Sequence, residues 1–352
     1  MDGTSAARVV VPGGNFLLTA DFHRSGPDLI LTGHDGHQVV VTGFFASAHP
    51  PALTTAAGAI IDADLAFKLA GPLAPGQYAQ ANGAASQLHA IGTVDKAAGS
   101  VTVRHSDGTS ETLTKGSTVY QGDLLETGKD GSVGIVFADR TVFSLGGGGR
   151  MVMDDLVYDA QAHSGHSAFS VVQGTFSFVS GQIAKSGADA MTVKTPVMTI
   201  GSRGTTVAGV ASAEGENNTV SLLPDADGGT GQILISNQSG TQVLTVANQT
   251  VQLSSAFEAP PPPVVLPQQQ LQQMYQSAVE ARPSQPTQDP PIHNDPVVPG
   301  QPGQPGAPAA APHGAAPGQT GQAPAGPSPQ LADVLQNKPS EDMRNDGVVS
   351  PS

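Results

Sequence analysis

Short apolar segments follow one another from Lys115 to Val210, separated by Gly, Asp and Ser at almost regular intervals. Within them, Val133, Ile135 and Phe137 alternate with other residues, which places all three on one face of a strand. Short alternating segments with frequent turn residues are typical of a protein made of many strands. We therefore predict an all-β domain over residues 89–257, built as a sandwich or as a solenoid-like stack of short strands.

A separate group of short apolar segments precedes this domain and predicts a small N-terminal β-unit over residues 8–79. Within it, Asp35-Gly36 supplies the positive φ that a tight hairpin turn demands. The Ala-rich stretch from His49 to Ala79 is interrupted by glycine and proline, so we expect a strand and a loop there rather than a helix. Small polar residues at 80–88 are typical of a linker between the two units.

Residues 258–352 contain most of the 29 prolines of the chain, together with many glycines and alanines. Proline fixes φ and donates no backbone hydrogen bond, and small residues offer little to bury, so this segment is predicted to be a disordered tail. Two stretches, 267–282 and 329–337, have apolar residues at helical spacing and predict short helices. In the first stretch the apolar stripe consists of Leu271, Met274, Tyr275 and Ala278.

The net charge of −14, with only 15 Lys and Arg residues, argues against nucleic acid as a partner, because such binding relies on clustered cations. The absence of Cys excludes disulfides, thiolate metal sites and cysteine nucleophiles. The N-terminal segment lacks a basic start followed by an unbroken apolar stretch, so no cleavable secretory signal is expected. No window approaches about 18 consecutive apolar residues, so no transmembrane segment is expected either.

Short motifs recur in a fixed order along the predicted β-domain. Gly-Asp-x-x-x-Thr is followed by an Asp-x-Thr turn, by Thr-Pro and by Arg-Gly-Thr, and the residues are Gly122, Asp123, Thr127, Asp139, Thr141, Thr195, Pro196, Arg203, Gly204 and Thr205. In this order and spacing the chain resembles the FecR-like domain of bacterial envelope proteins over about a hundred residues. It departs from the pattern at Arg140, where the family usually carries Gly.

The resemblance extends, from Asn15 to Gln252, to a subgroup of FecR-domain proteins found mostly in alphaproteobacteria. It implies an extracytoplasmic location, in the periplasm, at the cell surface or after secretion, whereas the sequence itself leaves the cytoplasm open. Membrane-anchored FecR regulators carry a cytoplasmic helical segment and a membrane span that relay a signal to a sigma factor. Neither is evident here, so transmembrane relay by this chain alone is not expected.

The resemblance also implies a non-catalytic binding or signalling module of the bacterial envelope that acts on a protein partner. Two alternatives stay open: a structural or adhesin-associated secreted surface protein, and a module that binds a glycan or a small molecule. The sequence contains no nucleophile elbow, zinc-protease helix or framed pair of carboxylates, so we expect no enzyme, no catalytic residue and no cofactor. The family-motif residues are expected to be structural.

Some polar clusters have residue types that bind metals, but each lacks part of a coordination shell. Asp225 and Asp227 precede a glycine as in a calcium loop, yet the bidentate Glu of such a loop is missing, so a polar hairpin turn is expected. Two histidine pairs are close enough in sequence to share a metal but have no third ligand nearby, namely His34 with His37 and His163 with His166. We therefore expect no metal site.

Three further features have a functional and a structural interpretation. Asp154, Asp155 and Asp159 have the chemistry of an acid or base, but nothing frames them in a pocket, so a solvated strand edge is favoured. Gly146 to Gly149 lacks the Lys-Ser/Thr of a phosphate loop and is expected to be a flexible connection. Arg203 either anchors a carboxylate within the domain or faces a partner, and we favour the intramolecular pair because the planar guanidinium suits it.

Overall fold

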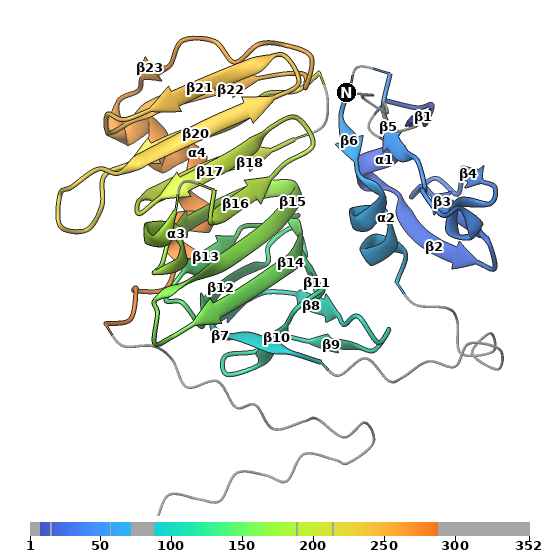
Figure 1. Ribbon diagram of the computed structural model, residues 1–352, viewed down its shortest axis with the longest axis horizontal. Helices are drawn as coiled ribbons and strands as arrows, with labels where there is room; N and C mark the ends of the chain where they lie inside the picture. Colours follow the sequence, from blue (N-terminus) through green and yellow to red (C-terminus); the bar gives the residue numbers. More distant parts are fainter. Residues whose placement is uncertain are drawn as a thin grey trace, which may run out of the picture. The chain divides into compact units, whose positions relative to one another are not determined.

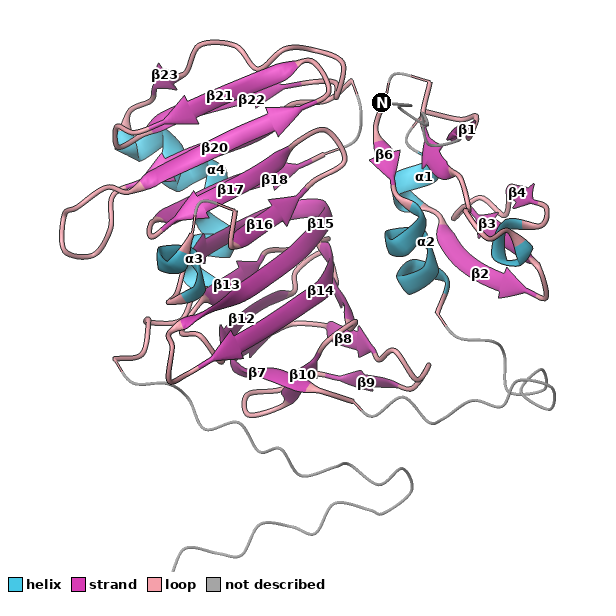
Figure 2. Cartoon of the chain, in the orientation of Figure 1, coloured by secondary structure: helices cyan, strands magenta, loops and turns pink. Residues whose placement is uncertain are grey.

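The computed structural model describes residues 8–14, 16–56, 58–71, 88–187, 189–212 and 215–287. β-Strands are the main regular structure of the described chain and the helices are few and short, so the predicted all-β fold class is confirmed (Figures 1 and 2). The predicted linker at 80–88 falls almost entirely outside the described residues. The same holds for the predicted tail from residue 288 onward, including the predicted helix at 329–337.

Seventeen strands, β7 to β23, form one connected network in the described chain, and their hydrogen-bond partners divide it into two sheets. The first sheet contains, in spatial order, β10 (Thr118–Tyr120), β7 (Ala90–Ala98), β12 (Ser132–Phe137), β13 (Val142–Leu145), the end of β15 (Ser164–Val179), β18 (Thr206–Ala211), β19 (Asn218–Leu223), β22 (Gln249–Leu253) and β23 (Val264–Val265). The second sheet contains β9 (Ser110–Thr112), β8 (Val101–Arg104), β11 (Leu124–Thr127), β14 (Arg150–Asp159), the start of β15, β16 (Met191–Lys194), β17 (Thr199–Arg203), β20 (Gln232–Asn237) and β21 (Gly240–Leu244).

Strand β15 belongs to both sheets. Its first part pairs with β14 and with β16, and from Gly174 onward it pairs with β18. Gly174 has a φ of 104°, and a β-carbon there would lie 2.5 Å from the α-carbon of Gly149, so glycine allows the strand to pass from one sheet to the other. From β12 onward the chain also alternates between the sheets in pairs of strands, which gives a sandwich that grows along one direction like a solenoid.

The core of the sandwich lies between the two sheets and explains the alternation seen in the sequence. Its largest members are five phenylalanines that are at most 1% exposed, Phe137, Phe143, Phe169, Phe176 and Phe178. Phe169 of the second sheet packs on Phe143 of the first, with ring centroids 5.5 Å apart. Inward side chains from both sheets therefore interdigitate as in other β-sandwiches.

Helix α4 (Gln268–Ala281) packs on the outer face of the first sheet and lies behind the strands in Figure 1. The face beneath it carries residues that are direct register neighbours across six strands. We call them the small-residue row: Gly134, Ser144, Ser177, Ala208, Ser221 and Thr250. A β-carbon at Gly134 would lie 2.1 Å from the Ala281 carbonyl oxygen, so the helix backbone almost touches the sheet.

One large side chain, Tyr275, is fully buried between α4 and this sheet. Its hydroxyl is hydrogen-bonded to Ser221 Oγ at 2.8 Å and donates to Thr219 Oγ1 at 3.1 Å. The structure thus differs from the expectation that disorder begins at residue 258. The surface on which α4 packs forms only after strands far apart in the sequence have paired. The local composition of residues 258–287 therefore does not reveal that surface.

The described part of the N-terminal unit contains two three-stranded sheets, two short α-helices and one 3-10 helix. Its elements are β1 (Arg8–Val10), α1 (Phe16–Thr19), β2 (Asp21–Ser25), β3 (Asp28–Thr32), β4 (Gln38–Val41), the 3-10 helix η1 (Phe44–Ala46), β5 (Ala52–Thr54), β6 (Ile60–Ile61) and α2 (Ala63–Ala70). Strands β3 and β4 form a hairpin around Asp35-Gly36, as the dipeptide suggested, and Gly36 has a φ of 80°.

Helix α2 corrects the expectation of strand and loop between His49 and Ala79. Asp62 caps the helix by accepting a hydrogen bond from the Leu65 amide at 2.8 Å, and Gly71 ends it with a φ of 70°. The eight-residue helix fits between the interrupting glycines at 58 and 71, which therefore bound the helix instead of preventing it. Its buried face, with Leu65 and Leu69, belongs to the same apolar cluster as Val152 of β14.

Candidate functional site

The first family motif forms a buried polar pair next to β11. Asp123 is fully buried, and its carboxylate lies 2.8 Å from His105 Nδ1 and accepts a hydrogen bond from the Tyr120 amide. Burial alone would lower the pKa of His105, but the hydrogen bond and charge of Asp123 outweigh it, so the pKa is raised. The sequence did not single out His105, because only the pairing of β8 with β11 brings it beside Asp123. The preceding residue, Gly122, has a φ of 83° in the turn before β11.

Thr127 holds the glycine-rich segment Gly146 to Gly149, which was expected to be a flexible connection. Its hydroxyl donates to the Gly146 carbonyl at 2.6 Å and accepts from the Gly149 amide at 2.7 Å. A β-carbon at Gly147 would lie 2.1 Å from the Lys129 carbonyl oxygen. These glycines therefore allow close backbone packing, and the expectation of a flexible connection was wrong.

Asp139 and Thr141 hold the turn between β12 and β13. The buried Asp139 carboxylate accepts hydrogen bonds from the Thr141 amide at 3.0 Å and from its hydroxyl at 2.8 Å. Burial raises the pKa of Asp139, and the hydrogen bonds from Thr141 oppose that change. Between them, Arg140 has a φ of 69°, a conformation that glycine adopts most easily. This is the position at which the resemblance led us to expect Gly.

The two closing motifs also lie in turns and loops. Thr195 and Met198 hydrogen-bond each other across the turn between β16 and β17, and the Pro196 carbonyl accepts from the Ile60 amide of the N-terminal unit at 3.2 Å. Gly204 has a φ of 63°, and the amide of the buried Thr205 donates to Ser180 Oγ at 2.7 Å. With the exception of Arg203, the motif residues thus make contacts that hold the backbone.

Arg203 does not form the intramolecular carboxylate pair that we favoured. Its side chain is exposed, and within the described residues no carboxylate lies at ion-pair distance from its guanidinium. Beside it on the outer face of the second sheet are Leu234 and Val243, which are register partners and are 36% and 39% exposed. We call Arg203, Gln232, Leu234 and Val243 the Arg203 face. Together with Asp189 and Gly201, these residues line a shallow cavity of about 160 Å³.

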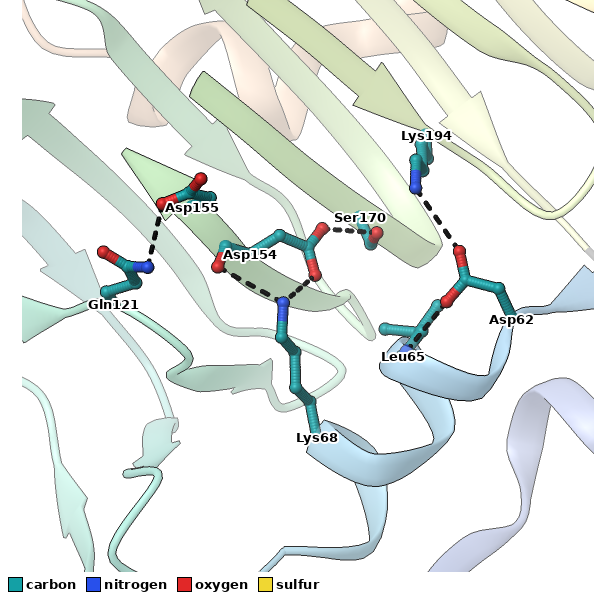
Figure 3. Close-up of polar contacts among 8 residues, drawn as sticks. All are labelled: Asp62, Leu65, Lys68, Gln121, Asp154, Asp155, Ser170 and Lys194. Carbon is teal, nitrogen blue, oxygen red and sulfur yellow. Dashed lines mark hydrogen bonds and ion pairs between the residues drawn. The ribbon is translucent and has the colours of Figure 1, made fainter. Parts of the chain in front are cut away.

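The three aspartates of the candidate acid–base cluster have separate partners, and Figure 3 draws those of Asp154 together with the contact between Asp155 and Gln121. Asp154 accepts from Lys68 Nζ of α2 at 2.7 Å and from Ser170 Oγ at 2.6 Å, so it is partly buried and not on a solvated strand edge. Asp155 accepts from the Gln121 side-chain amide and pairs with His166, which lies on β15. Asp159, which is exposed, has its pKa lowered by hydrogen bonds from the following turn.

The residues considered as metal ligands also have other partners. His163 Nδ1 lies 3.1 Å from the Tyr158 hydroxyl, and the His37 ring packs edge-on against Phe16. Asp225 accepts from the Thr206 hydroxyl and Asp227 from the Gly229 amide, as in a polar hairpin turn. Within the described part of the chain, no three His, Cys, Asp or Glu residues are arranged to hold a metal ion.

A groove of about 370 Å³ lies where the N-terminal unit meets the second sheet. We call it the seam groove. Its walls are Ile60, Ile61, Asp62 and Leu65 of the N-terminal unit, and Ser170 to Val172, Lys194 to Thr199, Ser236 to Gln238 and Ala256 of the sandwich. Lys194 and Asp62 form an ion pair of 3.3 Å (Figure 3). Both side chains are about half exposed, so the pair lies where the groove opens to solvent.

Comparison with known proteins identifies part of the sandwich. Residues 123–224 match the family model described as FecR protein, which confirms the predicted resemblance for that segment. No curated protein matches the chain. No described helix is both long enough and apolar enough to span a bilayer.

Two solved structures, at 2.50 and 1.65 Å resolution, are similar to part of the chain, and both are of a proposed anti-sigma factor from Parabacteroides distasonis. Their TM-scores are 0.29 and 0.28 and their sequence identities 16% and 15%. Each similarity covers 37% of this chain and 54% of the other, so the match spans about half the length of that protein. The FecR family match therefore covers the middle of the sandwich, residues 123–224.

Proposed function

We propose that this chain is a non-catalytic binding and signalling module of the bacterial envelope and that it acts by protein–protein recognition. The FecR match over residues 123–224 supports the class of protein. The recognition surface in this proposal is the Arg203 face. We also propose that the chain belongs to the subgroup of alphaproteobacterial FecR-domain proteins that its sequence resembles.

One observation carries the choice of surface: an exposed arginine without a described carboxylate partner lies beside two half-exposed apolar side chains on a rigid sheet. Arginine and apolar side chains are enriched at the centres of protein interfaces, where a guanidinium forms two parallel hydrogen bonds to one carboxylate. Other parts of the outer faces are covered, the second sheet by the N-terminal unit near Val152 and the first by α4. A partner that fits would present an apolar patch next to an Asp or Glu.

Site-specific photocrosslinking in cells tests the surface. A photoreactive residue placed at Leu234 or Val243 is expected to crosslink to one protein, and the same residue at Val157, an exposed position of β14, is not. Arg203→Glu should abolish the crosslinks at 234 because it turns an attraction into a repulsion, while the circular dichroism spectrum and Tm stay unchanged. Equal crosslinking at 157 and 234, or crosslinks that survive Arg203→Glu, would remove the Arg203 face from the proposal.

A further inference from the structure

The seam groove has the size and lining of a small-molecule site. Its volume of about 370 Å³ lies in the range of about 300 to 1,000 Å³ that such sites occupy. Most of the wall is apolar, with Ile60 and Leu65 from the N-terminal unit and Val172, Val197 and Met198 from the sandwich. At about 30 Å³ for each water-sized group, the groove holds roughly a dozen non-hydrogen atoms.

The turn that forms one wall does not need a ligand to satisfy its backbone. The Thr195 amide donates to the Met198 carbonyl at 2.8 Å, and the Met198 amide donates to Thr195 Oγ1 at 3.2 Å. The Pro196 carbonyl accepts from Ile60, which also joins the two walls. This wall therefore presents mainly apolar surface, and it favours an apolar ligand body.

The charged residues at the opening of the groove determine which polar group the ligand can carry at its outer end. Asp62 is already engaged by its role as the N-cap of α2, where its Oδ1 accepts from the Leu65 amide. Among the described residues, Lys194 is held only by the half-exposed Asp62 at 3.3 Å, and an exposed ion pair of this kind contributes about 0 to 1 kcal/mol. Lys68, by contrast, is fixed by the side chain and the backbone carbonyl of Asp154. Lys194 is thus the cation that can exchange its partner at low cost.

The sign of the ligand charge follows from the same groups. An anion at the opening would gain Lys194 and would lie near the N-terminal end of α2, where the helix dipole favours negative charge. A cation there would be repelled by Lys194 and by the helix dipole, and the only opposite charge among the described lining residues is Asp62, whose Oδ1 already accepts from the Leu65 amide. We propose that the seam groove binds a small organic monocarboxylate with an apolar body of about ten carbons, its carboxylate paired with Lys194. Because the walls come from both units, binding would also strengthen the contact between the N-terminal unit and the sandwich.

Calorimetric titration of the full chain with decanoate tests this site, with decanol and decylammonium as probes of the charge. Saturable binding of decanoate is expected, at least tenfold tighter than that of either control. Lys194→Gln should weaken decanoate binding about tenfold and leave decanol unchanged, and Ile60→Trp should fill the groove and abolish binding of both. Matched variants at exposed positions outside the groove, Lys115→Gln and Val40→Trp, should bind like the natural chain.

Hydrogen exchange then locates the ligand. Decanoate is expected to slow exchange at Ile60 and at Met198 together, because both walls close on it. Three results would each overturn the inference: no saturable binding, binding insensitive to both Lys194→Gln and Ile60→Trp, or equal affinity for decanoate and decylammonium. Arg203→Glu should leave decanoate binding unchanged, so this site and the proposed protein-recognition surface are tested independently.

Discussion

At the scale of single residues, Arg140 carries a measurable conformational cost. Its φ of 69° lies in the left-handed region, where a β-carbon crowds the following carbonyl and costs about 1 to 2 kcal/mol. The turn is held in place by Asp139 and Thr141, whose hydrogen bonds over-determine the backbone. A residue that departs from the family pattern can thus keep the conformation that the pattern requires.

Arg140→Gly should therefore raise the free energy of unfolding by about 0.5 to 1 kcal/mol, the relief of strain minus the larger entropy of glycine in the unfolded chain. Urea denaturation monitored by circular dichroism measures it. Arg140→Ala retains the β-carbon and serves as the control, with no gain expected. A glycine variant no more stable than the alanine variant would contradict this account.

His105 makes the stability of the sandwich depend on pH. Its pKa is raised above the ordinary value of 6.5 in the folded protein, mainly because the pairing with Asp123 outweighs burial. A raised pKa means that the folded state holds the proton more tightly than the unfolded state. The stabilisation is therefore complete below about pH 6.5 and is lost as the pH rises through the higher folded-state pKa.

We expect the free energy of unfolding of the natural chain to fall more steeply above pH 6.5 than that of His105→Gln. Urea titrations at a series of pH values from 5.5 to about 9 compare the two slopes. The two proteins differ at this one residue, so contributions from the rest of the chain cancel in the comparison. If the free energy of unfolding depended on pH in the same way in both proteins, Asp123 would not stabilise the protonated form of His105.

At the scale of elements, α4 is a helix made stable by the surface beneath it. Its N-cap is Pro267, which provides no side-chain hydrogen bond, and its sequence is rich in glutamine. The C-terminal end is tied down by polar contacts, with Lys96 donating to the Arg282 carbonyl and Arg282 donating to Ser177 Oγ. Tertiary packing rather than intrinsic propensity therefore holds this helix.

Gly134→Val should detach α4, because a β-carbon at this position would lie 2.1 Å from the Ala281 carbonyl oxygen. We expect a loss of about 1 to 3 kcal/mol in the free energy of unfolding and faster hydrogen exchange across Gln268–Ala281. Thr102→Val, at an exposed position of β8 in the other sheet, is the matched control. Retention of slow exchange in α4 would show that the sheet can move away from the helix.

At the scale of the whole molecule, the FecR match ends at residue 224 but the folded structure continues to residue 287. Removal of α4 would expose Ala208, Val210 and Leu223 and would leave the hydroxyl of Ser221 without its partner Tyr275. The loss of one buried aromatic side chain costs about 3 to 5 kcal/mol.

A chain that ends at residue 287 should accordingly unfold at the same temperature as the full chain. A chain that ends at residue 257 should have a Tm lower by about 6 °C or more and should bind a hydrophobic dye. Differential scanning calorimetry and dye fluorescence distinguish the two. Identical Tm values for both truncated chains would mean that α4 adds nothing to the stability of the sandwich.

These features also show where prediction from the sequence succeeds. Alternation at Val133, Ile135 and Phe137 and turn residues such as Gly36 depend on neighbours along the chain, so the strands and the hairpin could be predicted. Helix α2 was missed because its boundary signals, Asp62 and Gly71, were taken as interruptions. The site features were harder still. The pair of His105 with Asp123, the exposure of Arg203 and the seam groove all result from contacts between distant segments.

The small-residue row restricts side-chain size at positions that are far apart in the sequence and adjacent only in the folded structure. Its six members lie between residues 134 and 250 and belong to six strands, yet they are consecutive neighbours under one helix. Gly134 and Ser177 should reject large side chains as strictly as neighbours in a single packed core do, since Gly134 lies against the last residue of α4 and Ser177 against Arg282, which follows it. In a library of variants, intolerance to size should therefore recur at distant positions of the chain, and a larger side chain in the row should be compensated by a smaller one on α4.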